Sequence, residues 1–143
     1  MSFTSDLLDT PANLSRASKW TAMNGYIYLS LGALFMIWPG AVQTLFRDEP
    51  FVGREEGLFR ILGMTVAVIG WLYLFGGRSG GRQIIPASVL DRWILVPAVG
   101  VSVALSGVFP HAVLAFVLLD ALLALGALLL RTNHSQPADG IKV

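Results

Sequence analysis

The chain has 143 residues, of which 55% are hydrophobic and only 13% are charged. Soluble domains carry about a quarter charged residues, so this composition indicates a membrane protein, and the length allows one domain. The net charge of +1 argues against a nucleic-acid partner. The absence of cysteine excludes disulfides and thiolate metal sites.

Residues 1–19 form a mixed polar leader before the first apolar segment. Thr10 is a suitable helix cap, and Pro11 suits the first position of a helix. We therefore expect a helix to start there and either to lie at the cytoplasmic membrane surface or to continue into the first span.

Four apolar segments approach the length of about 20 residues that crosses a bilayer. They are residues 20–38, 57–75, 93–109 and 112–130. The segments predict an all-α membrane protein, a four-transmembrane-helix bundle over residues 20–131. Residues 39–46 are expected to form a short interfacial helix. Residues 132–143 are polar without an apolar period, so we expect a disordered tail.

The connections and the spacing of small residues favour a compact bundle. Ser106–His111 is short enough to require a tight hairpin between the last two spans. Small residues recur along each span, as Gly25 and Gly32 do in the first and Gly63 and Gly70 in the second. Lipid is as apolar as leucine, so such residues promote close helix packing in membranes.

The basic residues predict the orientation, because cytoplasmic loops of membrane proteins carry an excess of lysine and arginine. An even number of spans places both termini and the middle loop on one side. That side would hold Arg16, Lys19, Arg78, Arg82, Arg92, Arg131 and Lys142. The other side would hold Arg47, Arg54 and Arg60. Seven basic residues against three predict that both termini are cytoplasmic.

Asp120 lies in the middle of the most apolar segment, Ala115–Leu125. A central acid costs about 2.5–3.5 kcal/mol on insertion scales, so it should face the bundle rather than lipid. Arg60 is the charged partner in reach. The neutral candidates are Tyr26, Tyr28, Ser30, Thr65, Ser102 and Ser106. Asp120 is then either a clamp between helices, a working carboxylate that binds a proton or a ligand, or a contact with another protein's helix.

Three more residues are candidates for a polar site near the outer surface. Glu56 and Arg60 are four residues apart, so they share a helix face, which also carries Gly63 and Gly70 and should point into the bundle. His111 lies at the outer end of the last span and could join this pair. No set of histidines or carboxylates has the spacing of a metal site, so no metal and no cofactor is expected.

The segments Glu56–Arg78 and Asp91–Trp93, together with the late Asp120, resemble a loose group of small bacterial four-span proteins, most of them uncharacterised. This resemblance implies a helical bundle in the bacterial inner membrane and assigns no chemistry. The length also resembles that of small multidrug transporters, but those proteins carry an essential acid in the first span and this chain does not.

Three functions remain open on these residues. The first is a non-enzymatic accessory or scaffold subunit, with the lipid bilayer and a homo-oligomer or larger membrane complex as partners. The second is a small transporter or binder of an apolar or cationic ligand that uses Asp120, Glu56, Arg60 and His111. The third is a membrane enzyme, which would need at least two titratable groups at one cavity.

Overall fold

The computed structural model describes residues 9–81 and 83–132. Helices make up 79% of these described residues, and no strand occurs among them. The helical elements are α2 (Arg16–Ile37), α3 (Ala41–Phe46), α4 (Glu55–Arg78), α5 (Ile84–Leu90), the π-helical turn η1 (Asp91–Leu95), α6 (Val96–Leu105) and α7 (Pro110–Thr132). The expected disordered tail beyond Thr132 lies outside the described residues. The prediction of an all-helical chain is confirmed for the part described.

The first long helix begins later than the sequence predicted. Its N-cap is Ser15, whose backbone is extended and whose side-chain hydroxyl accepts the backbone N–H of Ser18 at 3.0 Å. Residues 11–15 are not helical, so the expected start at Thr10 and Pro11 is wrong. The Ser15 hydroxyl satisfies one of the free N–H groups of the first turn, and Thr10 instead accepts hydrogen bonds from Arg78.

Three helical segments are long and apolar enough to cross a membrane. They are Glu55–Arg78, Ile84–Leu105 and Pro110–Arg131. The second of these runs without a break through α5, η1 and α6, so it begins well before the expected position 93 and ends at Leu105 rather than 109. α2 is not among the three, because polar residues such as Asn24 lower its hydropathy. The structure therefore supports a helical membrane protein, and α2 as a fourth span stays a prediction.

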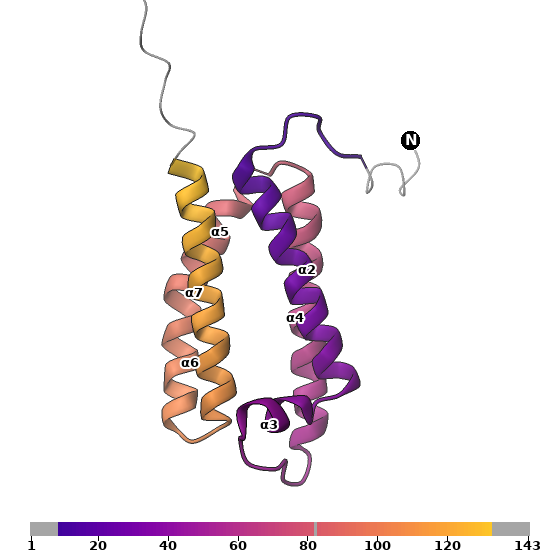
Figure 1. The fold of residues 1–143 in the computed structure, drawn as a ribbon, viewed down its shortest axis with the longest axis vertical. Helices are drawn as coiled ribbons and strands as arrows, with labels where there is room; N and C mark the ends of the chain where they lie inside the picture. Colours follow the sequence, from indigo (N-terminus) through magenta and orange to yellow (C-terminus); the bar gives the residue numbers. More distant parts are fainter. Residues whose placement is uncertain (1–8, 82, 133–143) are drawn as a thin grey trace, which may run out of the picture.

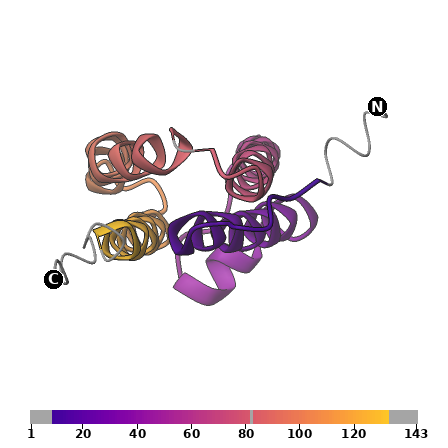
Figure 2. The ribbon, with the colours of Figure 1, turned by 90° about the horizontal axis from the view of Figure 1, so that it is seen from above.

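The helices form two antiparallel hairpins that stand side by side (Figures 1 and 2). One hairpin is α2 with α4, and the other is the α5–η1–α6 segment with α7. α2 begins and α7 ends at the same end of the bundle, and the short helix α3 closes the opposite end, called the α3 end below (Figure 1). The short helix expected within residues 39–46 is confirmed.

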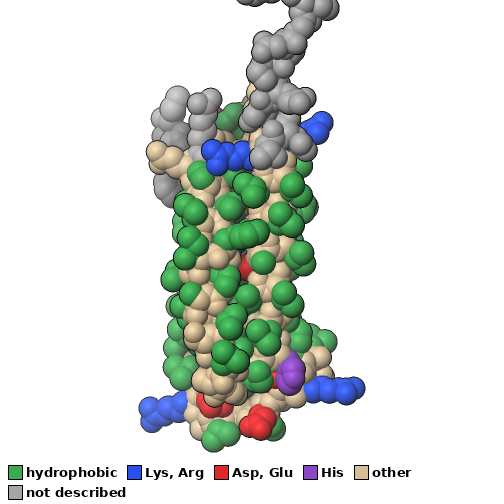
Figure 3. Space-filling view, turned by 90° about the vertical axis from the view of Figure 1, so that its left-hand side faces the viewer, with side chains coloured by type: hydrophobic (Ala, Val, Ile, Leu, Met, Phe, Trp, Pro, Cys, Tyr) green, Lys and Arg blue, Asp and Glu red, His purple; other side chains and the backbone are tan. Residues whose placement is uncertain are grey.

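The outward face of α6 and α7 is covered with apolar side chains, whereas charged side chains gather at the two ends of the bundle (Figure 3). Leu118 and Leu122 on α7 and Ile94 and Leu95 on η1 are more than half exposed. Such a distribution suits a bundle surrounded by hydrocarbon, because apolar residues are favourable there and charges are not.

The α2–α4 hairpin is held by close contact of the two backbones along a seam of small residues. A Cβ placed on Gly70 would lie 2.6 Å from Leu29 N, and one on Gly32 would lie 2.5 Å from Ala67 N. No side chain fits in that space, so the glycines are what allows α2 and α4 to approach. The predicted role of small residues in helix packing is confirmed for this pair.

The α6–α7 hairpin turns tightly at Ser106–Phe109, as the sequence predicted. Gly107 has a φ of +86°, a conformation that residues with a Cβ rarely adopt. Backbone N–H groups of Ser106, Gly107 and Val108 return to carbonyls in the last turn of α6. The connection is therefore short and hydrogen-bonded, and α7 can start at Pro110.

Candidate functional site

Asp120 lies inside the bundle at the middle of α7 and is 2% exposed. Ala124 and Ala127, which follow it on the same face, are fully buried. The prediction that Asp120 faces inward is confirmed. The helix surface around it is apolar, so the carboxylate needs a partner supplied by another element.

That partner is Arg92, which the sequence analysis placed at the cytoplasmic surface. Arg92 is 1% exposed, and its Nε lies 4.0 Å from Asp120 Oδ1. The surface placement is wrong because the third helical segment begins at Ile84, so that Arg92 lies about 12 Å along it at 1.5 Å per residue. The hydropathy pattern placed the start of this helix too late, at residue 93, and so left Arg92 outside it.

Arg92 belongs to the π-helical turn η1, Asp91–Leu95. A π-helical turn holds one residue more than an α-helical turn, which changes the direction of the residues on it, and such turns are frequent at functional sites. Here the exposed Trp93 and Ile94 follow the fully buried Arg92. The π-helical turn therefore coincides with the position at which Arg92 points its guanidinium into the bundle.

The guanidinium of Arg92 packs against two aromatic rings from the other hairpin. Its Cζ is 5.0 Å from the ring centre of Tyr28 on α2 and 4.5 Å from that of Tyr73 on α4. The two rings meet edge to face at 5.4 Å. An arginine over an aromatic face within about 6 Å is attracted by the ring quadrupole, so Arg92 joins one hairpin to the other.

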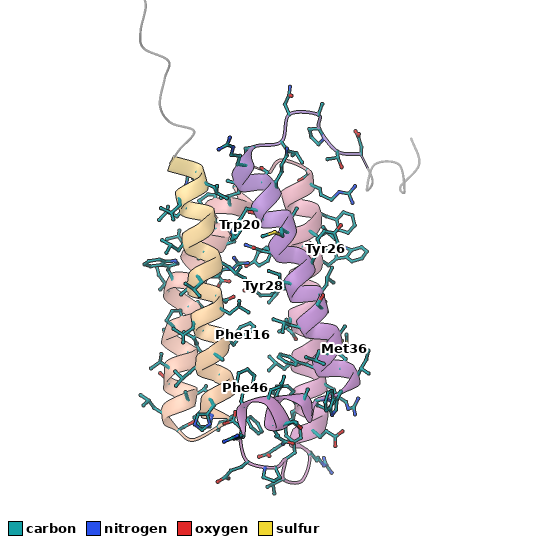
Figure 4. All side chains as sticks on the ribbon, in the orientation of Figure 1. Trp20, Tyr26, Tyr28, Met36, Phe46 and Phe116 are labelled. Carbon is teal, nitrogen blue, oxygen red and sulfur yellow. The ribbon has the colours of Figure 1, made fainter. Side chains whose placement is uncertain are left out.

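Two further polar contacts link α2 to the second hairpin near Arg92. With the Asn24 amide in the orientation that satisfies both its ends, its oxygen accepts from Arg92 Nη1 at 3.1 Å and its nitrogen donates to Trp20 O at 3.2 Å. Trp20 Nε1 donates to the backbone oxygen of Leu123 on α7 at 2.9 Å. Figure 4 shows Trp20 and Tyr28 pointing from α2 toward α7, while Tyr26 points away.

Some polar atoms of this centre have no hydrogen-bond partner among the described residues. They are Arg92 Nε and Nη2, Asp120 Oδ1 and Tyr28 Oη. Buried polar groups are paired in the great majority of proteins. The contact of Arg92 with Asp120 is therefore an ion pair at 4.0 Å without a direct hydrogen bond.

Arg92 and Asp120 are almost completely buried, at 1% and 2% exposure. Two pockets stand out among the described residues, and neither is lined by Arg92 or Asp120. One is an apolar pocket between α2, α3 and α7, and the other is an open, polar hollow at the α3 end. No group of three or more potential metal ligands occurs in the described part of the chain.

Glu56 and Arg60 do form the expected ion pair, at 2.8 Å. The pair does not point into the bundle as expected, because the Arg60 and Glu56 side chains are 45% and 54% exposed. Arg60 also donates to the backbone oxygen of Met36, one of the free carbonyls at the C-terminal end of α2. This contact directs Arg60 across the end of the hairpin and away from Asp120. The prediction that Arg60 is the partner of Asp120 is therefore wrong.

His111 does not join Glu56 and Arg60 but pairs with Asp48, which the sequence analysis did not single out. Asp48 Oδ1 lies 2.7 Å from His111 Nδ1 and accepts the His111 backbone N–H, while Oδ2 accepts the N–H of Ala112 at 2.9 Å. Burial raises the pKa of Asp48, but the bonds from Ala112 and His111 outweigh it and hold the pKa below its usual value. Asp48 thus serves the start of α7 as a cap.

The neutral partners proposed for Asp120 are mostly engaged elsewhere. The hydroxyls of Thr65, Ser102 and Ser106 donate to carbonyls of their own helices. Tyr28 does lie at the centre, through its contact with Arg92. Asn24 could have been noticed in the sequence, because it is a polar residue inside the first predicted span. Nothing in the sequence could pair it with an arginine 68 positions later.

No family model, curated protein or solved structure matches this chain. The resemblance to small bacterial four-span proteins therefore stays a prediction, and a function has to be argued from the geometry of this molecule.

Proposed function

We propose that this protein is a non-enzymatic accessory or scaffold subunit of the bacterial inner membrane, a four-span bundle with both termini in the cytoplasm. The observation that carries the proposal is the buried centre around Arg92 and Asp120. It engages Asp120, one of the two buried carboxylates of the described residues, in a contact between helices. A clamp of this kind makes two hairpins behave as one body, which is what a scaffold requires.

The geometry disfavours the transporter of a cationic ligand. Such a protein needs a carboxylate that a ligand can reach, whereas Asp120 is enclosed and faces the guanidinium of Arg92. Glu56 and Arg60 are too far toward the surface to share a site with it. An apolar ligand would need no carboxylate, and the apolar pocket at the α3 end keeps that alternative open.

The four-span topology is supported by the shape of the bundle. α2 is as long as the spans beside it and lies along α4 (Figures 1 and 2). Removing the buried Arg92 from the count of basic residues leaves six on the side of the termini against three at the α3 end. The bias still favours cytoplasmic termini.

Cysteine labelling tests this orientation, and the absence of native cysteine makes it clean. Single cysteines at Ser5 and Ser135 should resist an impermeant thiol reagent in intact cells, and a cysteine at Val52, between α3 and α4, should react. Reaction at either terminal position would overturn the topology.

The scaffold function is tested by the size of the particle extracted from membranes in a mild detergent. We expect a complex heavier than the 15.4 kDa chain, and we expect Asp120→Asn, which keeps the shape of the clamp, to preserve it. A monodisperse monomer from native membranes would contradict the proposal. Loss of the complex in Asp120→Asn at unchanged melting temperature would show instead that the carboxylate itself does the work.

A further inference from the structure

An apolar pocket of about 150 Å³ lies between α2, α3 and α7. The residues that shape it include Leu34 and Phe35 on α2, Val42 and Phe46 on α3, and Ala115 and Phe116 on α7. Phe46 and Phe116 point into the space between α7 and α2 (Figure 4). All the lining residues are apolar. A pocket with such a lining offers no hydrogen-bond partner to water and suits an apolar guest.

The exposed residues around α3, next to the pocket, are of the kinds found at a membrane interface. Ile37, Trp38 and Leu45, all around α3, are more than half exposed. A tryptophan with neighbouring apolar residues at the end of a span is typical of the interfacial belt. The lining continues from Ala112 to Leu119 along α7, a depth of about 11 Å at 1.5 Å per residue. The upper part of an acyl chain occupies this depth in a bilayer.

A positive charge adjoins the pocket, because Arg47 lines the neighbouring polar hollow at the α3 end, together with Glu49 and Glu55. Arg47 follows the lining residue Phe46 and ends α3 in a left-handed conformation, with a φ of 58°. Its side chain is exposed and has no ion pair or hydrogen bond among the described residues. The neighbouring Asp48 does not neutralise it, since that carboxylate is turned inward to His111 and Ala112.

From this juxtaposition we propose that the protein binds one phospholipid at the α3 end, with an acyl chain in the apolar pocket and the phosphate on Arg47. The lining offers no polar partner to a guest, and Arg47 in the adjoining hollow offers a cation to the phosphate. The proposal requires only that this end of the bundle lies in a bilayer; it holds whether or not the protein is a scaffold.

The test is native mass spectrometry of the detergent-purified protein titrated with phosphatidylglycerol that carries palmitoyl and oleoyl chains. The unaltered protein should retain one lipid more tightly than any further lipid. Ala115→Phe, which fills the pocket, should remove this first tight lipid. Arg47→Gln should weaken its binding about fivefold, the effect of one basic residue near a lipid headgroup.

Two matched variants control for non-specific effects. Ala98→Phe adds the same ring on the exposed face of α6, and Arg54→Gln removes a charge from an exposed residue at the same end of the bundle. Both should bind lipid as the unaltered protein does. Equal binding by Ala115→Phe and Ala98→Phe would overturn the proposal. So would a dimer in the unaltered protein that Ala115→Phe converts to a monomer, because a second copy would then fill the pocket.

If Ala115→Phe fails to fold, Ala115→Leu takes its place. It adds less volume, and its melting temperature should stay close to that of the unaltered protein. It should still weaken the first lipid, and an unchanged affinity in a folded Ala115→Leu would likewise overturn the proposal.

Discussion

The contact between α2 and α4 and the contact between the two hairpins are built in opposite ways. Along the α2–α4 seam, glycines such as Gly32 and Gly70 bring backbones together, and no long side chain stands between them. Between the hairpins the backbones are farther apart, and Trp20, Arg92 and Asp48 reach across from their own elements. We call this second set of contacts, with Asn24, Tyr28, Tyr73 and Asp120, the hairpin joint.

The seam and the joint hold helices together in two different ways. Burying apolar surface against other helices gains little when the surroundings are also apolar, so helices associate by close packing or by polar contacts. Apart from the hydrogen bond of Arg60 to the Met36 carbonyl at its end, the seam uses packing and tolerates no added volume. The joint uses polar and aromatic side chains, whose loss leaves partners unsatisfied. The variants below break one contact or the other, from the largest expected effect to the smallest.

Arg92→Met breaks the joint at its centre. Removing one member of a buried ion pair typically costs about 3–5 kcal/mol, because the other charge stays buried without a partner. The double variant Arg92→Met/Asp120→Leu should recover most of this loss. The free energy of unfolding in mixed micelles measures both, with Arg54→Met as the exposed control. A double variant no more stable than Arg92→Met would show that the carboxylate does not depend on Arg92.

Gly70→Val breaks the seam. The new side chain would collide with Leu29 N and Gly25 O of α2, and overpacking typically costs about 1–3 kcal/mol. Gly57→Val is the matched control, since a Cβ there meets nothing within 4 Å. Equal stability of the two variants would mean that α2 and α4 are not in backbone contact. A larger loss in Gly70→Val than in Arg92→Met would reverse the ranking of seam and joint.

Asp48→Ala tests the joint at the α3 end, where Asp48 caps α7. Loss of a helix cap costs about 0.5–2 kcal/mol. The pKa of Asp48 is lower in the folded protein than its usual value. Its stabilisation is therefore complete above the unfolded pKa of about 3.9 and is lost as the pH falls through the folded pKa.

When the free energy of unfolding is measured from pH 7 downward, it should fall less in Asp48→Ala than in the unaltered protein. Glu49→Ala removes an exposed neighbouring acid and should keep the original pH profile. Parallel profiles for the unaltered protein and Asp48→Ala would contradict the capping role.

The smallest effect is expected at Glu56 and Arg60, at the end of the α2–α4 hairpin. Exposed pairs four residues apart on a helix contribute about 0.3–0.5 kcal/mol, and both side chains are about half exposed. A double-mutant cycle in thermal stability should give coupling in that range. Coupling of several times this size would place the pair inside the bundle, as the sequence first indicated.

Much of the architecture follows from the sequence because it depends on local rules. Apolar length predicts the helices, small residues predict close helix packing without naming the partners, and the short segment Ser106–His111 predicts the tight turn between the last two helices. The inward placement of Asp120 also follows, because hydrocarbon penalises a charge wherever the helix is placed. These features need no knowledge of which helices are neighbours.

Only the tertiary structure decided the partners. Arg92 and Asp120 are 28 positions apart, Asp48 and His111 are 63 apart, and Trp20 contacts Leu123 across 103 positions. Each pairing depends on where whole helices begin, on the π-helical turn that directs Arg92 inward, and on how the hairpins stand together. Charge and hydropathy placed Asp120 inside the bundle but left Arg92 at the surface, and they do not say which helix lies opposite either residue. That choice is made by packing, which sets the distance between backbones and so determines which side chains are long enough to meet.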